Sequence, residues 1–219
     1  MQASDLLSSS IFPLKPGDTC GFAKEMMSEW MVNHLPVVVE ENLLGIVSGK
    51  DIIGIAANKK IDTYITTLHG YEVVENNHLF QLLGVFGHTG YSVLPVLTIS
   101  GNYLGSITLP HLLALTSQLL TIQQEGAIVS LEMNLIDYSL SEIARITESD
   151  NIKIMGLIIN KMNDPNRIQV HLKLNSWQVN GLMATLNRFN YTVIGVYTTA
   201  AMLDDLKGRY DTLMKYLDI

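Results

Sequence analysis

The stretch Leu35–Asp51, LPVVVEENLLGIVSGKD, decides the fold because it occurs twice in the chain. Its second copy is Leu94–His111, LPVLTISGNYLGSITLPH, which matches it in order and in residue character. The offset is 59 residues between the prolines at 36 and 95, and 60 residues between the glycines at 45 and 105. The extra residue falls in the turn between two predicted strands, where insertions are tolerated. A repeat of this period is typical of a structural unit that is used twice.

The residues around each copy predict a β-α-β-β-α unit of about 60 residues. The first unit is predicted to contain strands at 11–14, 35–39 and 43–48, a helix from an N-cap at Asp18 to Trp30, and a short helix at 51–57. The second unit is predicted to contain strands at 71–74, 93–99 and 103–108, a helix capped by Asn77 with Leu79, Leu82, Leu83 and Phe86 buried, and a helix at 110–123. Units this small bury little surface alone, so we expect the two to pack sheet against sheet.

The order of elements changes after Gln123–Gly126, which predicts a domain boundary. Strands are predicted at 127–133, 153–161, 167–174 and 191–197; one helix starts at the capping box Ser139–Glu142, and another is capped by Asn175 or Ser176. This β-α-β-β-α-β order is ferredoxin-like, which makes the whole chain an α/β (α+β) protein. The predicted domains are 1–60, 61–124, 126–198 and a C-terminal amphipathic helix at 199–219, with Leu203, Leu206, Tyr210, Leu213 and Leu217 on one stripe.

The composition narrows the class of protein. Apolar residues make up 47% of the 219 residues, which is enough for a core, and the net charge of -7 argues against a nucleic-acid surface. The single cysteine, Cys20, cannot form an internal disulfide. No signal segment and no membrane span are predicted, so we expect a cytoplasmic protein. No catalytic motif and no metal-ligand spacing of histidines with Cys20 was found, so we expect neither an enzyme nor a metal site.

The doubled unit resembles the CBS-domain family, named after cystathionine β-synthase. The LPVV strand, the Leu-Gly-Ile-Val strand and the Ser48-x-x-Asp51 step carry the resemblance, which covers about residues 1–123. The remainder, especially Asp137–Ala144, looks like an ACT domain, and the combination is similar to CBS–ACT proteins of the acetoin-utilisation type. The resemblance implies a homodimeric or larger regulatory protein that binds an adenosyl ligand (AMP, ADP, ATP or S-adenosylmethionine) and signals to an unknown partner protein, without nucleic acid or membrane.

The resemblance also implies where such a ligand binds. In nucleotide-binding members, the position of Asp51 holds the ribose hydroxyls and the position of Ser48 faces a phosphate, with Lys50 near it. The backbone at Phe12 and Pro13 lies against the base, and His34 is within reach. A carboxylate can accept from two hydroxyls, and a helix N-terminus favours an anion. The same serine and aspartate would equally form a capping box, so the two readings stay open.

The second copy departs from this pattern. Thr108 keeps the hydroxyl, but His111 stands where the aspartate is expected, and a neutral histidine offers one acceptor instead of two. We therefore expect at most one orthodox adenosyl site, with Thr108 and His111 forming a helix cap and an exposed histidine. In the ACT-like part, the loop 134–138 lacks a glycine and carries Asp137.

Two functions are the alternatives to an adenosyl-binding sensor. One is a ligand-free oligomerisation scaffold, and the other is an amino-acid-binding ACT regulator.

Overall fold

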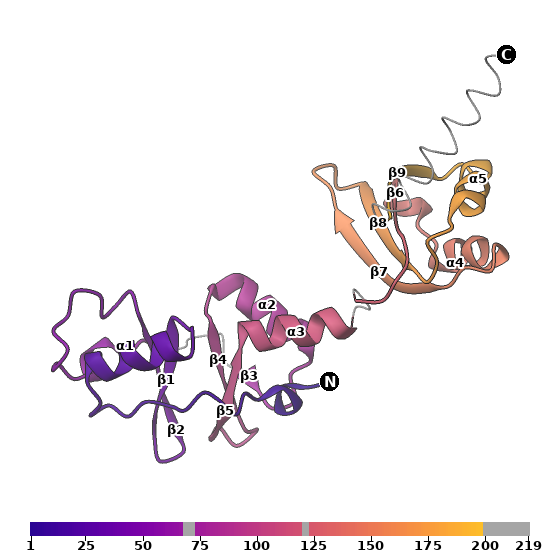
Figure 1. Ribbon diagram of the computed structural model, residues 1–219. Helices are drawn as coiled ribbons and strands as arrows, with labels where there is room; N and C mark the ends of the chain where they lie inside the picture. The colour runs from indigo at the N-terminus through magenta and orange to yellow at the C-terminus, as the bar shows by residue number, and fades with distance from the viewer. Residues whose placement is uncertain (68–72, 120–122, 199–219) are drawn as a thin grey trace. The chain divides into compact units, whose positions relative to one another are not determined.

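The computed structural model describes residues 1–67, 73–119 and 123–198 (Figure 1). The chain divides into two compact units, Met1–Thr116 and Ser117–Ile219, and each is described by itself. The boundary predicted near residue 125 falls inside the second of these units. The helix predicted at 199–219, the first two residues of the strand predicted at 71–74 and residues 120–122 of the helix predicted at 110–123 lie outside the described residues.

The first copy folds as a helix followed by a β-hairpin. A 3-10 turn, η1 (Ala3–Leu6), precedes α1 (Cys20–Glu29), and β1 (His34–Val39) pairs antiparallel with β2 (Asn42–Ser48). The predicted strand at 11–14 is reduced to one residue, because only Leu14 bonds to β1, through Pro36 and Val38. The face of α1 that carries Ala23 and Met27 is buried, as the spacing of its apolar residues predicts.

The second copy repeats this arrangement, and the described residues of its first strand are Val73 and Val74. It contains β3 (Val73–Val74), α2 (Leu79–Thr89), β4 (Val93–Leu97), β5 (Tyr103–Thr108) and α3 (Leu109–Leu119), and its sheet has the order β3-β4-β5. Val73 pairs in parallel with Val96, exactly as Leu14 pairs with Val37 fifty-nine residues earlier. On α2, Leu79, Leu82 and Phe86 are buried and Leu83 packs against the same core, as predicted.

The segment after β2 differs from the prediction. Residues 51–57 form turns and not a helix, although a 3-10 turn, η2 (Asp62–Tyr64), follows. The carbonyls of Ala57 and Lys59 instead accept from Gly21 and Cys20, the first N–H groups of α1. These tertiary bonds satisfy donors that every helix start leaves open, and they hold the segment out of helical geometry.

The predicted helix caps shift by one residue. The N-cap of α1 is Thr19, whose hydroxyl accepts from the N–H of Phe22 at 3.2 Å, while Asp18 accepts from the N–H of Lys15 at 2.7 Å. In the second copy the N-cap of α2 is His78, and Asn77 accepts from the N–H of Val74. Both polar side chains therefore close the turn that leads into the helix, by accepting from the backbone N–H three residues before them.

The second unit is a four-stranded antiparallel sheet with helices on one face (Figure 1). Its elements are β6 (Ile128–Asn134), η3 (Leu135–Asp137), α4 (Leu140–Ser149), β7 (Ile154–Lys161), β8 (Arg167–Leu174), α5 (Asn180–Arg188) and β9 (Thr192–Tyr197), and the strand order is β7-β8-β6-β9. Alternate residues of β8 are buried against the helices, including Ile168 and Val170. The predicted ferredoxin-like order is confirmed, and with it the mixed α/β class of the chain.

The sequence predicts the caps of both helices in this unit. Ser139 accepts from the N–H of Glu142 at 3.3 Å and caps α4, as predicted. The prediction that Asn175 or Ser176 caps α5 is wrong. Val179 occupies the N-cap position without a side-chain bond. The amide oxygen of Asn175 is used elsewhere, because it accepts from the N–H of Lys153 at 2.7 Å where the neighbouring strand begins.

Candidate functional site

A cleft of about 540 Å³ lies where the first copy meets the end of α2 in the second. It is lined by Lys24, Met27, Ser28, Val32, Asn33, His34, Ser48, Gly49, Lys50, Ile53 and Gly90. The volume falls in the range of small-molecule sites in proteins. All these residues belong to the unit Met1–Thr116, so the cleft is formed within one compact body.

The strand pairing brings the predicted residues of the cleft together. His34 is the first residue of β1 and Ser48 the last of β2, and the register places them directly opposite each other. The N–H of Gly49 donates to the carbonyl of Asn33 at 2.8 Å, which holds the chain close to the start of β1 as it leaves β2. The hydroxyl of Ser48 accepts from the N–H of Lys50 at 3.1 Å and so closes a short turn. Lys50 is exposed at the mouth of this turn.

A hydrogen-bond bridge joins the two copies beside the cleft. The hydroxyl of Ser92 accepts from the N–H of Asn33 at 2.8 Å, and the N–H of Ser92 lies 3.1 Å from Nδ1 of His34, to which it donates. The rings of His34 and Tyr91 are 4.9 Å apart. Ser92 follows Asn33 by 59 residues, so the bridge joins equivalent positions of the repeat. Any ligand that touches His34 therefore touches the contact between the copies.

The environment of His34 favours its neutral form. Burial lowers the pKa of His34 from its ordinary value of 6.5; Asp51 opposes this and Lys50 adds to it. A neutral ring can accept at Nδ1 from the backbone of Ser92, whereas a protonated ring cannot. The bridge and the lowered pKa therefore have the same cause, which is the enclosed position of this histidine between the two copies.

The charges of the cleft favour an anion. Two lysines and no carboxylate are found among the described residues that line it. The ammonium of Lys24 donates to the carbonyl of Ile55 at 3.0 Å and is fixed in place. Within the described part of the chain the ammonium of Lys50 has neither a hydrogen bond nor an ion pair, so it is available to a ligand.

The other predicted residues lie outside this lining. Asp51 is exposed, yet it is near enough to influence the pKa of His34. Phe12 is 64% exposed and its ring contacts that of Trp30, with centroids 6.1 Å apart, while Pro13 is half-buried. The structure thus brings His34, Ser48 and Lys50 together, and places Asp51 beside them and Phe12 and Pro13 apart.

In the second copy, Thr108 and His111 form the start of α3. The hydroxyl of Thr108 accepts from the N–H of His111 at 3.3 Å, and His111 is exposed, as expected from the sequence. The reasoning from sequence missed Lys24, Asn33 and Ser92. Lys24 looks like any surface lysine of a helix, but Asn33 and Ser92 occupy equivalent positions of the repeat and could have been paired on that ground.

The loop 134–138 of the second unit lies beside a polar hollow of about 430 Å³ that is rich in carboxylates. Glu132, Asp137 and Glu142 line it; Glu132 pairs with Arg167, and the hydroxyl of Tyr191 donates to Glu142 at 3.2 Å. Burial, and after it the Glu142 carboxylate, raises the pKa of Tyr191 to about 12. These charges disfavour the carboxylate of an amino acid.

Residues 1–67, 73–119 and 123–198 contain no group of three or more histidine, cysteine, aspartate or glutamate side chains that could hold a metal ion. In the same ranges, every helix is too short or too polar to span a bilayer.

Among curated proteins, the chain is 24% identical over 115 residues to an uncharacterized 17.7 kDa protein of Acidianus ambivalens, a match that covers 51% of this chain and 70% of that one. It is 27% identical over 109 residues to an uncharacterized protein of Methanocaldococcus jannaschii, where the match covers 49% of this chain and only 41% of the relative.

Solved structures with a similar fold match about half of the chain. A CBS domain pair/ACT domain protein from Thermotoga maritima is 16% identical, with a TM-score of 0.49, over 54% of this chain and 98% of that one. AcuB of Vibrio cholerae, assigned to acetoin utilization, is 22% identical, with a TM-score of 0.49, over 56% and 95%. CBSX2 of Arabidopsis thaliana, solved in complex with AMP, is 21% identical, with a TM-score of 0.45, over 53% and 96%.

The family model of the CBS domain matches residues 3–58, which include α1, β1, β2 and most of the residues that line the cleft. The second copy has the same order of helix and hairpin, in the same register. The match over residues 3–58 confirms the resemblance to the CBS-domain family that the repeated stretch carries.

Proposed function

We propose that the protein is a non-enzymatic sensor that binds an adenosyl ligand in the cleft between its two copies and passes the signal to a partner protein. The observation that carries this is the cleft itself: about 540 Å³, lined by two lysines, with no carboxylate among its described lining residues. An adenosyl ligand with phosphate groups supplies the matching negative charge and an apolar base. AMP, ADP, ATP and S-adenosylmethionine are the candidates that the family resemblance implies, and CBSX2 was solved with the first of them.

The lining residues separate into a polar and an apolar group. Ser48, Gly49 and Lys50 are consecutive and offer a hydroxyl, a backbone and an ammonium to a phosphate. Met27, Val32 and Ile53 supply apolar surface for the adenine base. Asp51 follows directly and is exposed, where its carboxylate can accept from ribose hydroxyls. In this arrangement the turn after β2 holds the phosphate end of the ligand.

The bridge beside the cleft is the element through which binding acts in this proposal. Ser92 of the second copy bonds to Asn33 and His34 of the first, and both of those residues line the cleft. A ligand that binds one arrangement of this bridge better than another shifts the population of the two. The signal then reaches a partner protein as a change in how the copies contact each other.

The ligand-free scaffold is the second candidate, and one observation favours it. In the second copy the hydroxyl of Thr108 already accepts from the N–H of His111, and no aspartate follows it. If the first copy is equally unable to bind, both units serve only to pair subunits.

Isothermal titration of the full-length protein with each of the four adenosyl compounds tests the proposal. At least one compound is expected to bind, and Lys50→Gln is expected to weaken its binding by about ten- to a hundredfold, because a charge-assisted hydrogen bond contributes about 1.5–3 kcal/mol. Lys59→Gln is the matched control, since Lys59 is an exposed lysine outside the cleft. Heat release with none of the four compounds would contradict the nucleotide part of the proposal and leave the scaffold.

A further inference from the structure

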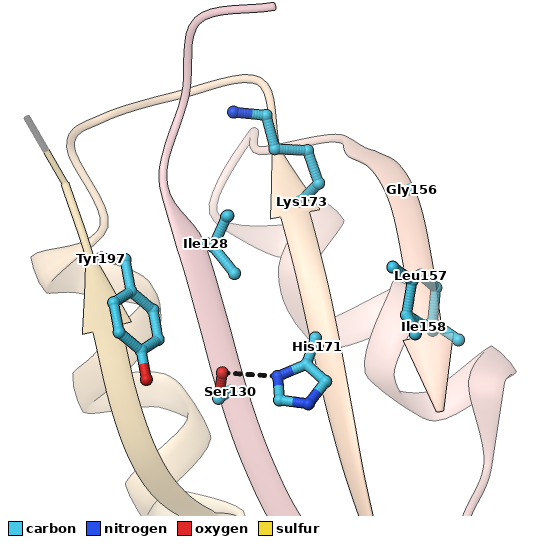
Figure 2. A pocket seen from close by; sticks show the side chains of 8 residues that line it. All are labelled: Ile128, Ser130, Gly156, Leu157, Ile158, His171, Lys173 and Tyr197. Carbon is cyan, nitrogen blue, oxygen red and sulfur yellow. Dashed lines mark hydrogen bonds between the residues drawn. The ribbon is translucent and has the colours of Figure 1, made fainter. Parts of the chain in front are cut away.

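One face of the sheet in the second unit holds a hollow that α4 and α5 do not cover. These helices pack on the opposite face, where alternate residues of β8 are buried. The hollow has a volume of about 410 Å³, which falls in the range of small-molecule sites. Its lining includes Ile128 and Ser130 of β6, His171 and Lys173 of β8, Ile158 of β7 and Tyr197 of β9 (Figure 2). These residues belong to one compact unit, and none of them lines the cleft of the first unit.

The strand register explains why this face is hollowed. Residues that lie opposite each other in antiparallel strands point to the same face, and Ser130 of β6 lies opposite Gly195 of β9. A serine and a glycine at the centre of the sheet leave space that larger side chains would fill. In the next row, Ile128 lies opposite both Lys173 and Tyr197. The hollow therefore follows from the small residues of one row, bordered by the larger residues of the next.

Apolar groups form two opposite walls of the hollow. The ring of Tyr197 lies back along β9 over Gly195, since a Cβ atom at Gly195 would come within 3.0 Å of the tyrosine hydroxyl and 3.1 Å of the ring carbons. Ile158, on the other edge strand, forms the facing wall (Figure 2). Tyr197 is 61% exposed and Ile158 is 50% exposed, so both present apolar surface that a ligand could cover. An aromatic and an aliphatic wall suit the apolar body of a small molecule.

The polar groups on the floor of the hollow are paired with each other. Oγ of Ser130 lies 2.7 Å from Nδ1 of His171, and Ser130 is 1% exposed (Figure 2). An apolar body can therefore lie on this floor without leaving the hydroxyl or this ring nitrogen unsatisfied.

Lys173 supplies a positive charge at one end of the hollow, and the described lining contains no carboxylate. Its ammonium donates to the carbonyl of Gly126 at 2.7 Å and lies 5.6 Å from the centroid of the Trp177 ring. An ammonium has three N–H groups, so donors remain for a ligand. Within residues 1–67, 73–119 and 123–198 no carboxylate forms an ion pair with Lys173. A carboxylate on a ligand would supply this counter-charge and accept a charge-assisted hydrogen bond.

We propose that this hollow binds a small organic acid, whose apolar body lies between Tyr197 and Ile158 and whose carboxylate lies at Lys173. The ligand is an acid without an amino group. The ammonium of an amino acid would be repelled by that of Lys173, and no described lining residue carries a carboxylate to receive it. The site is separate from the cleft of the first unit and does not depend on an adenosyl ligand.

Isothermal titration of the full-length protein with matched probes tests the class of ligand. Phenylacetate, phenylacetamide and phenethylamine share one apolar body and carry a negative charge, no charge and a positive charge. Phenylacetate is expected to bind with a Kd of about 1 mM or tighter. It is expected to bind at least about tenfold more tightly than the other two compounds. Equal binding of the three compounds, or no binding of phenylacetate up to about 10 mM, would overturn the proposal.

Lys173→Met tests the role of the charge, because it removes the ammonium and keeps an apolar stem. It is expected to weaken the binding of phenylacetate about tenfold and to leave that of phenylacetamide within about twofold. Lys161→Met is the matched control, since Lys161 is an exposed lysine at the end of β7 outside the lining, and it is expected to change neither. An equal loss for the acid and the amide, or an equal loss in both lysine variants, would refute the assignment of the carboxylate to Lys173.

Filling the hollow tests the location of the site. Ile128→Trp and Ile158→Trp each enlarge a partly exposed side chain of the lining, and circular dichroism checks that the variants are folded. Both are expected to weaken the binding of phenylacetate at least about tenfold, because the indole takes the place of the apolar body. Lys50→Gln, in the cleft of the first unit, is expected to leave this binding unchanged, so the adenosyl proposal and this one can fail independently. Binding that persists in both filled variants, or that is lost in Lys50→Gln, would place the acid elsewhere and reject the proposal.

Discussion

The two glycines of the repeated stretch offer a matched pair for mutation. Gly45 in β2 pairs with Val37, and Gly105 in β5 pairs with Val96, each next to the same irregularity of the strand. By sequence they are equivalent. In the structure they face different neighbours, because Gly45 packs against the backbone of Thr66 and Gly105 packs against the side chain of Leu7. We therefore expect Gly45→Ala and Gly105→Ala to differ strongly in stability.

The magnitude follows from what a methyl group would meet. At Gly45 it would overlap the carbonyl oxygen of Thr66, which accepts from the N–H of Ile46 at 2.9 Å, while the N–H of Thr66 donates to the carbonyl of Ile46 at 2.8 Å. Gly45 also has a φ of +150°, which costs an alanine about 1–3 kcal/mol. Displacing the packed backbone costs about 1–3 kcal/mol more, so the free energy of unfolding falls by roughly 2–6 kcal/mol.

At Gly105 the same change is mild. The methyl group would lie 3.2 and 3.3 Å from the two terminal carbons of Leu7, a side chain that can move by a few tenths of an ångström. Alanine also restricts the unfolded chain, which favours folding by about 0.4–1 kcal/mol. The net change in the free energy of unfolding is expected to stay within about 1 kcal/mol.

Urea unfolding followed by tryptophan fluorescence measures the difference. The chain has two tryptophans, Trp30 in the N-terminal unit and Trp177 in the other, so a Trp177→Phe background restricts the signal to the unit that contains both glycines. With a slope of about 1–3 kcal/mol per molar urea, the midpoints of the two variants should differ by roughly 1–2 M. Equal midpoints would refute the argument from the neighbours of the two glycines.

Three further predictions concern stability. The free energy of unfolding should fall as the pH drops below about 6.5, because the pKa of His34 is lowered in the folded protein and the unfolded chain therefore binds the proton first. The fall should level off below the pKa of His34 in the folded protein. His34→Asn keeps an acceptor for Ser92 and should remove this part of the pH dependence of the urea midpoint. Gly126→Ala should lower the stability of the second unit by about 3 kcal/mol or more, since Gly126 has a φ of +135° and a methyl group there would overlap the carbonyl of Leu174, and Trp177 fluorescence reports it. Ser139→Ala should cost about 0.5–2 kcal/mol through the lost cap of α4, and an unchanged midpoint would show that water replaces this bond.

Much of the fold could be predicted from local pattern. The doubled stretch, the apolar spacing on α1 and α2 and the alternation along β8 each reflect a single buried face, and such faces leave a periodic trace in the sequence. The same holds for the cap of α4, whose partners are three residues apart. Of the cleft, His34, Ser48 and Lys50 could be named because the family resemblance of the repeated stretch implies them.

Long-range contacts decided the rest. Residues 51–57 do not form a helix because the carbonyls of Ala57 and Lys59 accept from the first N–H groups of α1. Asn175 does not cap α5 because its side-chain oxygen accepts from the N–H of Lys153. Lys24 reaches the cleft only because α1 packs beside the hairpin. None of these partners is close in sequence, so no local pattern records them.

The sequence by itself determined that one unit is used twice, because the same buried faces require the same spacing of apolar residues in both copies. Only the tertiary structure decided which residues pack against each copy. Backbone from residues 65–66 lies against β2, whereas the N-terminal Leu7 and Ser8 lie against β5, and so two glycines that are equal in the repeat have unequal surroundings. The physical reason is that packing partners come from distant parts of the chain, where the repeat no longer holds.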